Sequence, residues 1–124
     1  MRVFLGVMAF WPGLALGQEP ILLPSGAQAA LVEVIANSPG SNGPALRYRF
    51  VAPDLGAAEA VSADSDWLCQ TYALPRLPVT GPVPGEIIIS LADRDVPLGE
   101  SDPEARQFFN AYSIEAGNCL WEPF

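Results

Sequence analysis

The chain contains no histidine and no lysine, and all six of its basic residues are arginines. Without histidine it can form neither a Ser-His-Asp triad nor a Cys-His pair, and His-based zinc or haem sites are excluded. Without lysine it has no Schiff-base or P-loop lysine, and no glycine-rich phosphate loop is present. We predict no cofactor and no dedicated metal site. What remains is a binding module, or an enzyme using paired carboxylates or an oxygen-ligated metal.

Residues 1–17 are typical of a secretory signal peptide. Arg2 precedes an apolar run over residues 3–16, and Ala15-Leu16-Gly17 supplies small side chains at the cleavage positions. The run is shorter than the ~20 residues that a membrane-spanning helix requires. We therefore expect cleavage near Gly17, a periplasmic or secreted product that does not insert into the membrane, and a single domain over residues 18–124. The alternative is a buried N-terminal core helix.

The expected mature chain is strongly acidic. The whole chain carries a net charge of −8, and loss of Arg2 makes it more negative by one unit. Nucleic acids and anionic membranes bind clustered Lys and Arg side chains, so neither is an expected partner. Half of the residues are hydrophobic, which argues against disorder. No oligomeric state follows from the composition.

Both cysteines, Cys69 and Cys119, lie beyond the expected signal peptide. In an oxidising compartment two lone cysteines most simply pair with each other. A disulfide between them would close a loop of about 50 residues, which stabilises a domain by about 4 kcal/mol. A catalytic thiol is the alternative, but the chain has no histidine to activate one. We predict a Cys69–Cys119 disulfide.

The first half of the mature chain predicts a hairpin followed by a helix. Strands are expected at residues 29–36 and 45–52, on either side of a turn-rich segment. The second strand alternates, so that one face holds Leu46, Tyr48 and Phe50 and the other holds Arg47, Arg49 and Val51. A helix is expected over residues 63–73, with Ser62 or Asp64 as its N-cap and Pro75 ending it.

The second half predicts a buried strand and a second helix. The Ile-rich run 86–92 is typical of a central strand covered on both faces, and a short strand is expected at 96–98. Asp102 then suits a helix N-cap, with Pro103 at the first helical position. Four apolar side chains follow at helical spacing: Ala105, Phe108, Phe109 and Tyr112. Gly117 ends this helix, and residues 118–123 form a last short strand.

The expected order is therefore strand, strand, helix, strand, short strand, helix, strand. It indicates an α+β fold in which two helices pack on one face of a small, mostly antiparallel sheet. The disulfide would join the first helix to the last strand.

The best candidate site is Asp93-Arg94-Asp95, at the end of the buried strand. Functional side chains often lie at such positions, and Arg94 could bind an anion with two hydrogen bonds. The alternative is a chain reversal, since Asp favours the first position of a turn. A calcium site that adds Glu100 and Asp102 is a further alternative, although the spacing differs from the calcium-loop motif.

Two smaller features could also bind a partner. Arg47 and Arg49 share a strand face and could form an anion-binding patch, or Glu33 on the neighbouring strand could pair with one of them. Trp67, Trp121 and Phe124 could form an exposed aromatic surface. The alternative is core packing, which we expect for at least Trp121.

Several segments, in this order, carry a resemblance to a known family: 47–53 (RYRFVAP), 68–69 (LC), 73–75 (ALP), 89–94 (ISLADR), 107–112 (QFFNAY) and 119–122 (CLWE). The chain resembles a family of small exported alphaproteobacterial proteins of unknown function, domain of unknown function 6497. The resemblance implies no activity, cofactor or site residue. The segment between Pro53 and Asp64 is shorter than in the family, and Leu98 replaces an aromatic residue. Some such proteins are labelled acetolactate synthase, which neither the length nor the expected export fits.

The leading hypothesis is a non-enzymatic binding or accessory module that meets a protein or another envelope component. The alternative is a small carboxylate- or metal-dependent enzyme centred on Asp93, Arg94 and Asp95. These hypotheses differ in one observable feature. An enzyme requires Asp93 and Arg94 in a concave pocket with other converging acids, whereas a convex turn with solvated side chains removes that centre.

Overall fold

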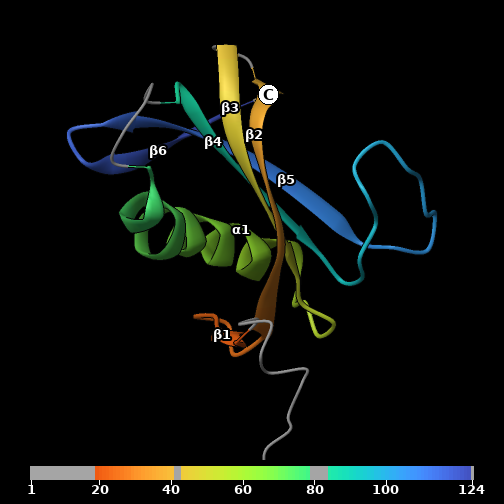
Figure 1. Cartoon of the computed structure of the whole chain (residues 1–124). Helices are drawn as coiled ribbons and strands as arrows, with labels where there is room; N and C mark the ends of the chain where they lie inside the picture. The colour runs from red at the N-terminus through yellow and green to blue at the C-terminus, as the bar shows by residue number, and fades with distance from the viewer. Residues whose placement is uncertain (1–18, 41–42, 79–83, 124) are drawn as a thin grey trace, which may run out of the picture.

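A computed structural model describes residues 19–40, 43–78 and 84–123. Its main element is a six-stranded sheet with the spatial order β1-β2-β3-β4-β5-β6. The strands are β1 (Ile21–Leu22), β2 (Gln28–Gly40), β3 (Gly43–Val51), β4 (Glu86–Ala92), β5 (Gln107–Glu115) and β6 (Asn118–Glu122). The sheet curls like half a barrel, and the helix α1 (Ala58–Trp67) crosses one of its faces (Figure 1).

The sheet is antiparallel except between β3 and β4, which run parallel. A parallel pair needs a long crossover connection, and the helical segment after β3 supplies it. The crossover lays α1 on the apolar side of the sheet. There, Leu46, Tyr48 and Phe50 of β3 are buried as the alternation predicts. The predicted hairpin is also confirmed, because β2 pairs antiparallel with β3.

Strand β4 is a central strand of the sheet, between β3 and β5. All seven of its residues are buried, which confirms the prediction of a strand covered on both faces. Ile87, Ile89 and Leu91 belong to the main core beneath α1, while Ile88 packs on the opposite side with Ala45 and Ala111.

The prediction of two helices is wrong, because residues 107–115 form strand β5. Its register with β4 places Phe108 opposite Leu91 and Tyr112 opposite Ile87. The aromatic side chains that fit a helical period therefore also fit a strand period, and pairing with strands on both sides decides the outcome. The described part of the chain holds one helical segment, and the fold is mostly β rather than α+β with two helices.

The start of the supposed second helix is a turn that uses the expected capping chemistry. The Asp102 carboxylate accepts a hydrogen bond from the Glu104 N–H at 3.0 Å, and the Ala105 N–H reaches the Asp102 carbonyl at 3.1 Å. This is an Asx-type turn that no helix follows. Residues 96–98, expected as a short strand, belong to the same loop between β4 and β5.

The supposed end of that helix is a β-hairpin turn between β5 and β6. Ala116 and Gly117 both have positive φ, 52° and 77°, and Glu115 pairs with Asn118. Positive φ at both central residues is the geometry of a type I′ turn. Gly117 therefore reverses a strand instead of ending a helix.

The first helix begins earlier than the sequence predicts, and it is not capped by Ser62 or Asp64. Its N-cap residue, Ala57, makes no side-chain capping bond. Asp64 lies inside the helix, fully buried, and accepts hydrogen bonds from the Ser25 N–H at 3.0 Å and the Ser25 hydroxyl at 2.6 Å. The Asp64 carboxylate thus attaches the loop between β1 and β2 to α1.

Beyond α1 the helical segment changes geometry. A π-helical turn, η2 (Leu68–Ala73), follows directly, and a 3₁₀ turn, η3 (Leu74–Arg76), contains Pro75. Proline fits an early position in a new turn, because no N–H is required there. From η2, buried Cys69 forms the predicted disulfide with Cys119 of β6. The first helical segment is therefore bonded to the last strand, as expected.

The signal peptide predicted at residues 1–17 lies outside the described residues, so its cleavage near Gly17 stays a prediction. Within the described ranges, no helix has both the length and the apolar character needed to cross a membrane.

Candidate functional site

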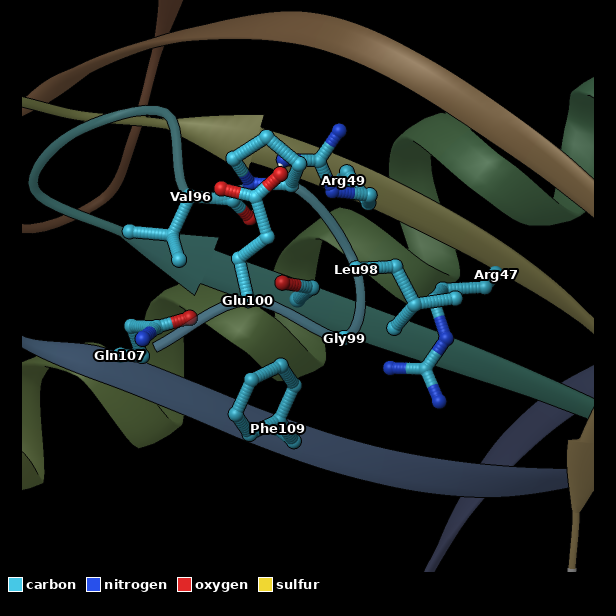
Figure 2. A pocket seen from close by; sticks show the side chains of 10 residues that line it. Arg47, Arg49, Val96, Leu98, Gly99, Glu100, Gln107 and Phe109 are labelled. Carbon is cyan, nitrogen blue, oxygen red and sulfur yellow. Dashed lines mark hydrogen bonds between the residues drawn. The ribbon is translucent and has the colours of Figure 1, made fainter. Parts of the chain in front are cut away.

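The side of the sheet opposite α1, here called the open face, carries the polar candidates. Register places Arg47 of β3 beside Ile88 of β4, and Arg49 beside Ser90. Phe109 of β5 lies on the other side of Ser90. Among the described residues, no helix covers this face. The loop of residues 93–106 between β4 and β5, here called the β4–β5 loop, folds back over one end of it (Figure 2).

Arg49 fixes the β4–β5 loop to the sheet. Its guanidinium donates to Glu33 at 2.5 Å, to Asp95 at 2.6 Å and to the carbonyl of Val96 at 2.8 Å. Its side chain is only 9% exposed. Burial acts to lower the pKa of Arg49, but the hydrogen bonds and charges of Asp95 and Glu33 outweigh burial and raise it. The predicted cross-strand pair with Glu33 is confirmed, and it involves Arg49 rather than Arg47.

Arg47 lies two residues away on the same face and has a different environment. Its Nε donates to the hydroxyl of Ser38 at 3.1 Å, and its guanidinium lies 5.8 Å from the centre of the Phe109 ring. Across the described ranges, no carboxylate lies within ion-pair distance of it. Burial and the neighbouring positive charge of Arg49 both lower the pKa of Arg47. Arg47 is therefore a partly buried positive charge without an acidic partner in this part of the chain.

A small cavity lies between Arg47 and the β4–β5 loop. It has a volume of about 50 Å³, and its lining comprises Arg47, Arg49, Ser90, Gln107, Phe109 and residues 96–100. Figure 2 shows Leu98, Gly99 and Glu100 of the loop in front of the sheet, with Arg47 at one end. The Glu100 carboxylate lies toward Arg49 and away from Arg47 in this view. The cavity thus combines one unneutralised guanidinium with polar groups and an aromatic ring.

Asp93, Arg94 and Asp95 do not line this cavity, and their side chains do not share one binding partner. Asp93 accepts from Arg94 Nε at 3.1 Å and from the backbone N–H of Arg106 at 3.0 Å. Asp95 points to Arg49. Arg94 does not line this cavity, and its side chain is about half exposed. The hydrogen bond and charge of Arg94 lower the pKa of Asp93. The three residues therefore form a chain reversal, and their role in binding a ligand stays a prediction.

The four acidic residues of the alternative calcium site do not come together in the described structure either. In residues 19–40, 43–78 and 84–123, no three Cys, Asp or Glu side chains gather closely enough to hold a metal ion. Asp102 is engaged by its own turn, and Asp95 by Arg49.

The predicted aromatic surface is only partly present. Trp121 is 56% exposed, so its expected core packing is wrong, and its indole N–H donates to Asn110 at 3.0 Å. Trp67 packs against the main core instead. Phe124 lies outside the described residues.

Sequence reasoning missed Ser90 and Gln107, which line the cavity, and Ser38, which accepts the hydrogen bond from Arg47. Ser90 lies on the open face because it is in register with Arg49 and Phe109. Gln107 lies there because it is two residues before Phe109 on the same strand. An alternating polar position inside the apolar run of β4 was the available signal for Ser90. A helix over residues 105–112 would not place Gln107 on a sheet face, so the predicted helix hid this residue.

Six antiparallel or parallel strands, one crossover helix and one disulfide define a small disulfide-bonded sheet protein. The chain belongs to a family of unknown function, DUF6497, whose model matches residues 8–124. No curated protein and no solved structure matches the chain.

Proposed function

We propose that this protein is a non-enzymatic binding or accessory module, exported to the periplasm or secreted, that contacts a protein of the cell envelope through its open face. One observation carries the proposal: Arg47 has no acidic partner in the described ranges and lies beside exposed apolar side chains. Phe109 is 43% exposed and Leu98 is 51% exposed. Arginine and aromatic side chains are enriched at protein interfaces, and they dominate the binding energy there.

Export is supported by the signal-like residues 1–17 and by the disulfide, since disulfides persist in oxidising compartments. The strongly acidic composition favours a protein partner over a nucleic acid or an anionic membrane.

Site-specific photocrosslinking in the native host tests the proposal. A photoreactive residue replaces Leu98 on the open face or, as the matched control, Thr71, which is exposed in η2 on the helix side. We expect a discrete adduct from position 98 that an excess of unlabelled protein suppresses, and no such adduct from position 71. Equal adducts from both positions, or an adduct insensitive to the competitor, would contradict the open face as the contact surface.

A further inference from the structure

We infer that the cavity beside Arg47 is a carboxylate-binding subsite, which takes the side chain of one Glu or Asp residue of the protein partner. This inference rests on the proposed function and names the chemistry that the partner presents to the open face.

The geometry of Arg47 leaves one end of its guanidinium available. Nε is engaged by the Ser38 hydroxyl, which fixes the orientation of the planar group. Among the described residues, no hydrogen bond or ion pair engages the terminal Nη1 and Nη2 groups. Two parallel N–H groups at the end of a guanidinium match the two oxygens of a carboxylate.

The local charges favour a single negative charge over a doubly charged group. The positive charge of Arg49 is already matched by Glu33 and Asp95, so only Arg47 remains to be neutralised. Glu100 lines the same cavity. A phosphate dianion would therefore face one available arginine and three nearby acids, whereas a carboxylate balances Arg47 alone.

The size and the walls of the cavity agree with this assignment. A volume of about 50 Å³ exceeds the ~10–15 Å³ that a cavity needs in order to hold one water molecule, so a small polar group has room to enter. Leu98 and Phe109, both exposed, line the cavity. They can contact the methylene groups of an acidic side chain, or its apolar neighbours, while Arg47 holds the charged end.

Titration of the purified, disulfide-bonded protein with sodium acetate tests the subsite without the partner. In ¹H–¹⁵N NMR spectra at constant ionic strength, we expect saturable shifts for the amides of Arg47, Ser90, Leu98, Gly99 and Phe109, with a dissociation constant on the order of 10 mM. Inorganic phosphate at the same ionic strength is expected to bind more weakly. Shifts that do not saturate, or phosphate binding tighter than acetate, would overturn the inference.

Two arginine variants supply the matched comparison. R47M should weaken acetate binding by about tenfold, because a charge-assisted hydrogen bond is lost. R94M should leave it unchanged, since Arg94 is exposed and bonded to Asp93. R47K keeps the charge but loses the paired N–H groups, and should recover only part of the affinity. Equal acetate affinity in R47M and wild type would overturn the assignment, provided that the spectra show both folded.

Capped peptides identify the source of the carboxylate. Acetyl-Leu-Glu-amide carries only a side-chain carboxylate, and acetyl-Leu-Gln carries only a C-terminal one. Tighter binding of the first than of acetate supports a side chain of the partner, whereas a gain confined to the second overturns that part of the inference.

The acetate titration and the crosslinking experiment fail independently. Acetate binding without an adduct from position 98 would leave the subsite standing and remove the proposed contact surface. A specific adduct without acetate binding would leave the contact surface standing and remove the subsite.

Discussion

The two faces of the sheet use their polar groups differently. Beneath α1, the hydroxyl of buried Tyr112 donates to Asp66 at 2.6 Å and Asp64 holds Ser25, while the disulfide joins η2 to β6. These contacts join one element of the fold to another. On the open face, Arg49 does the same for the β4–β5 loop, but Arg47, two residues away, holds no second element through an ion pair in the described chain.

The difference between Arg47 and Arg49 shows how similar side chains on one strand face can have separate roles. Arg49 is surrounded by acceptors that belong to the fold, so its charge is used in stability. Arg47 lines a cavity, and among the described residues no hydrogen bond or ion pair engages its terminal N–H groups. A partly buried charge without a partner costs free energy in the isolated protein, and a ligand that neutralises it recovers that cost.

The largest expected effect lies on the helix-covered face. Replacing both cysteines (C69A together with C119A) should lower the free energy of unfolding by about 4 kcal/mol, because the unfolded chain gains the entropy of a loop spanning 50 positions. Urea unfolding of the variant and of the oxidised wild type measures the difference. Acetate binding should persist wherever the variant is folded; its loss in a folded variant would contradict the separate roles of the two faces.

The two arginines should differ clearly in their effect on stability. R49M removes the bonds to Glu33, Asp95 and Val96 and should cost about 2 kcal/mol, discounted because both carboxylates are partly solvated. R47M, the matched control, should change the free energy of unfolding by less than about 0.5 kcal/mol, because the lost hydrogen bond to Ser38 offsets the removal of a partly buried charge. Chemical denaturation of both variants checks this, and equal losses would remove the distinction between them.

Alkaline pH should weaken the contact between β5 and α1. Burial raises the pKa of Tyr112, and its hydrogen bond to Asp66 raises it further. The folded state therefore retains a proton that the unfolded state loses above pH ~10. The contribution of the protonated Tyr112 hydroxyl to the free energy of unfolding is complete below pH ~10. Above that pH it declines by about 1.4 kcal/mol per pH unit. Urea unfolding at pH 9 to 11 should show a shallower decline for Y112F; identical slopes would contradict the assignment.

A smaller gain is expected within α1. The hydroxyl of Ser65 is buried and has no hydrogen-bond partner in the described structure. S65A should therefore raise the free energy of unfolding by about 1 kcal/mol, through removal of the unsatisfied group and a better helix propensity. S62A is the control, because Ser62 is exposed in the same helix and gains only the propensity, about 0.5 kcal/mol. A loss of stability in S65A would show that the hydroxyl is satisfied in solution.

Local sequence patterns correctly predicted those parts of the fold for which the residues are compatible with only one structure. The alternation in β3, the continuous apolar run in β4 and the pair of cysteines each left little choice. Residues 107–115 were ambiguous, because Phe108 and Tyr112 lie on one face both in a helix and in a strand; in the strand, Phe109 lies on the opposite face. Only pairing with β4 and β6, which is a property of the whole sheet, resolved that ambiguity.

The two arginines of the candidate site were predictable from the sequence, but the grouping of the site residues was not. Arg47 and Arg49 were identified from the alternation of β3, and Glu33 as a possible partner. Which arginine Glu33 contacts depends on the register between β2 and β3, which includes irregularities after Leu31 and Ile35. The cavity depends on how the β4–β5 loop folds back through Asp95 and Val96. Sequence patterns within one strand carry neither kind of information.

The yield of the position-98 photocrosslink in cells that produce R47M or R94M tests whether Arg47 binds the partner. If Arg47 binds an acidic side chain of the partner, R47M should reduce the adduct about tenfold at equal protein level, while R94M should leave it unchanged. An adduct of equal yield in wild type, R47M and R94M would contradict the central claim that Arg47 is the charged contact of the open face.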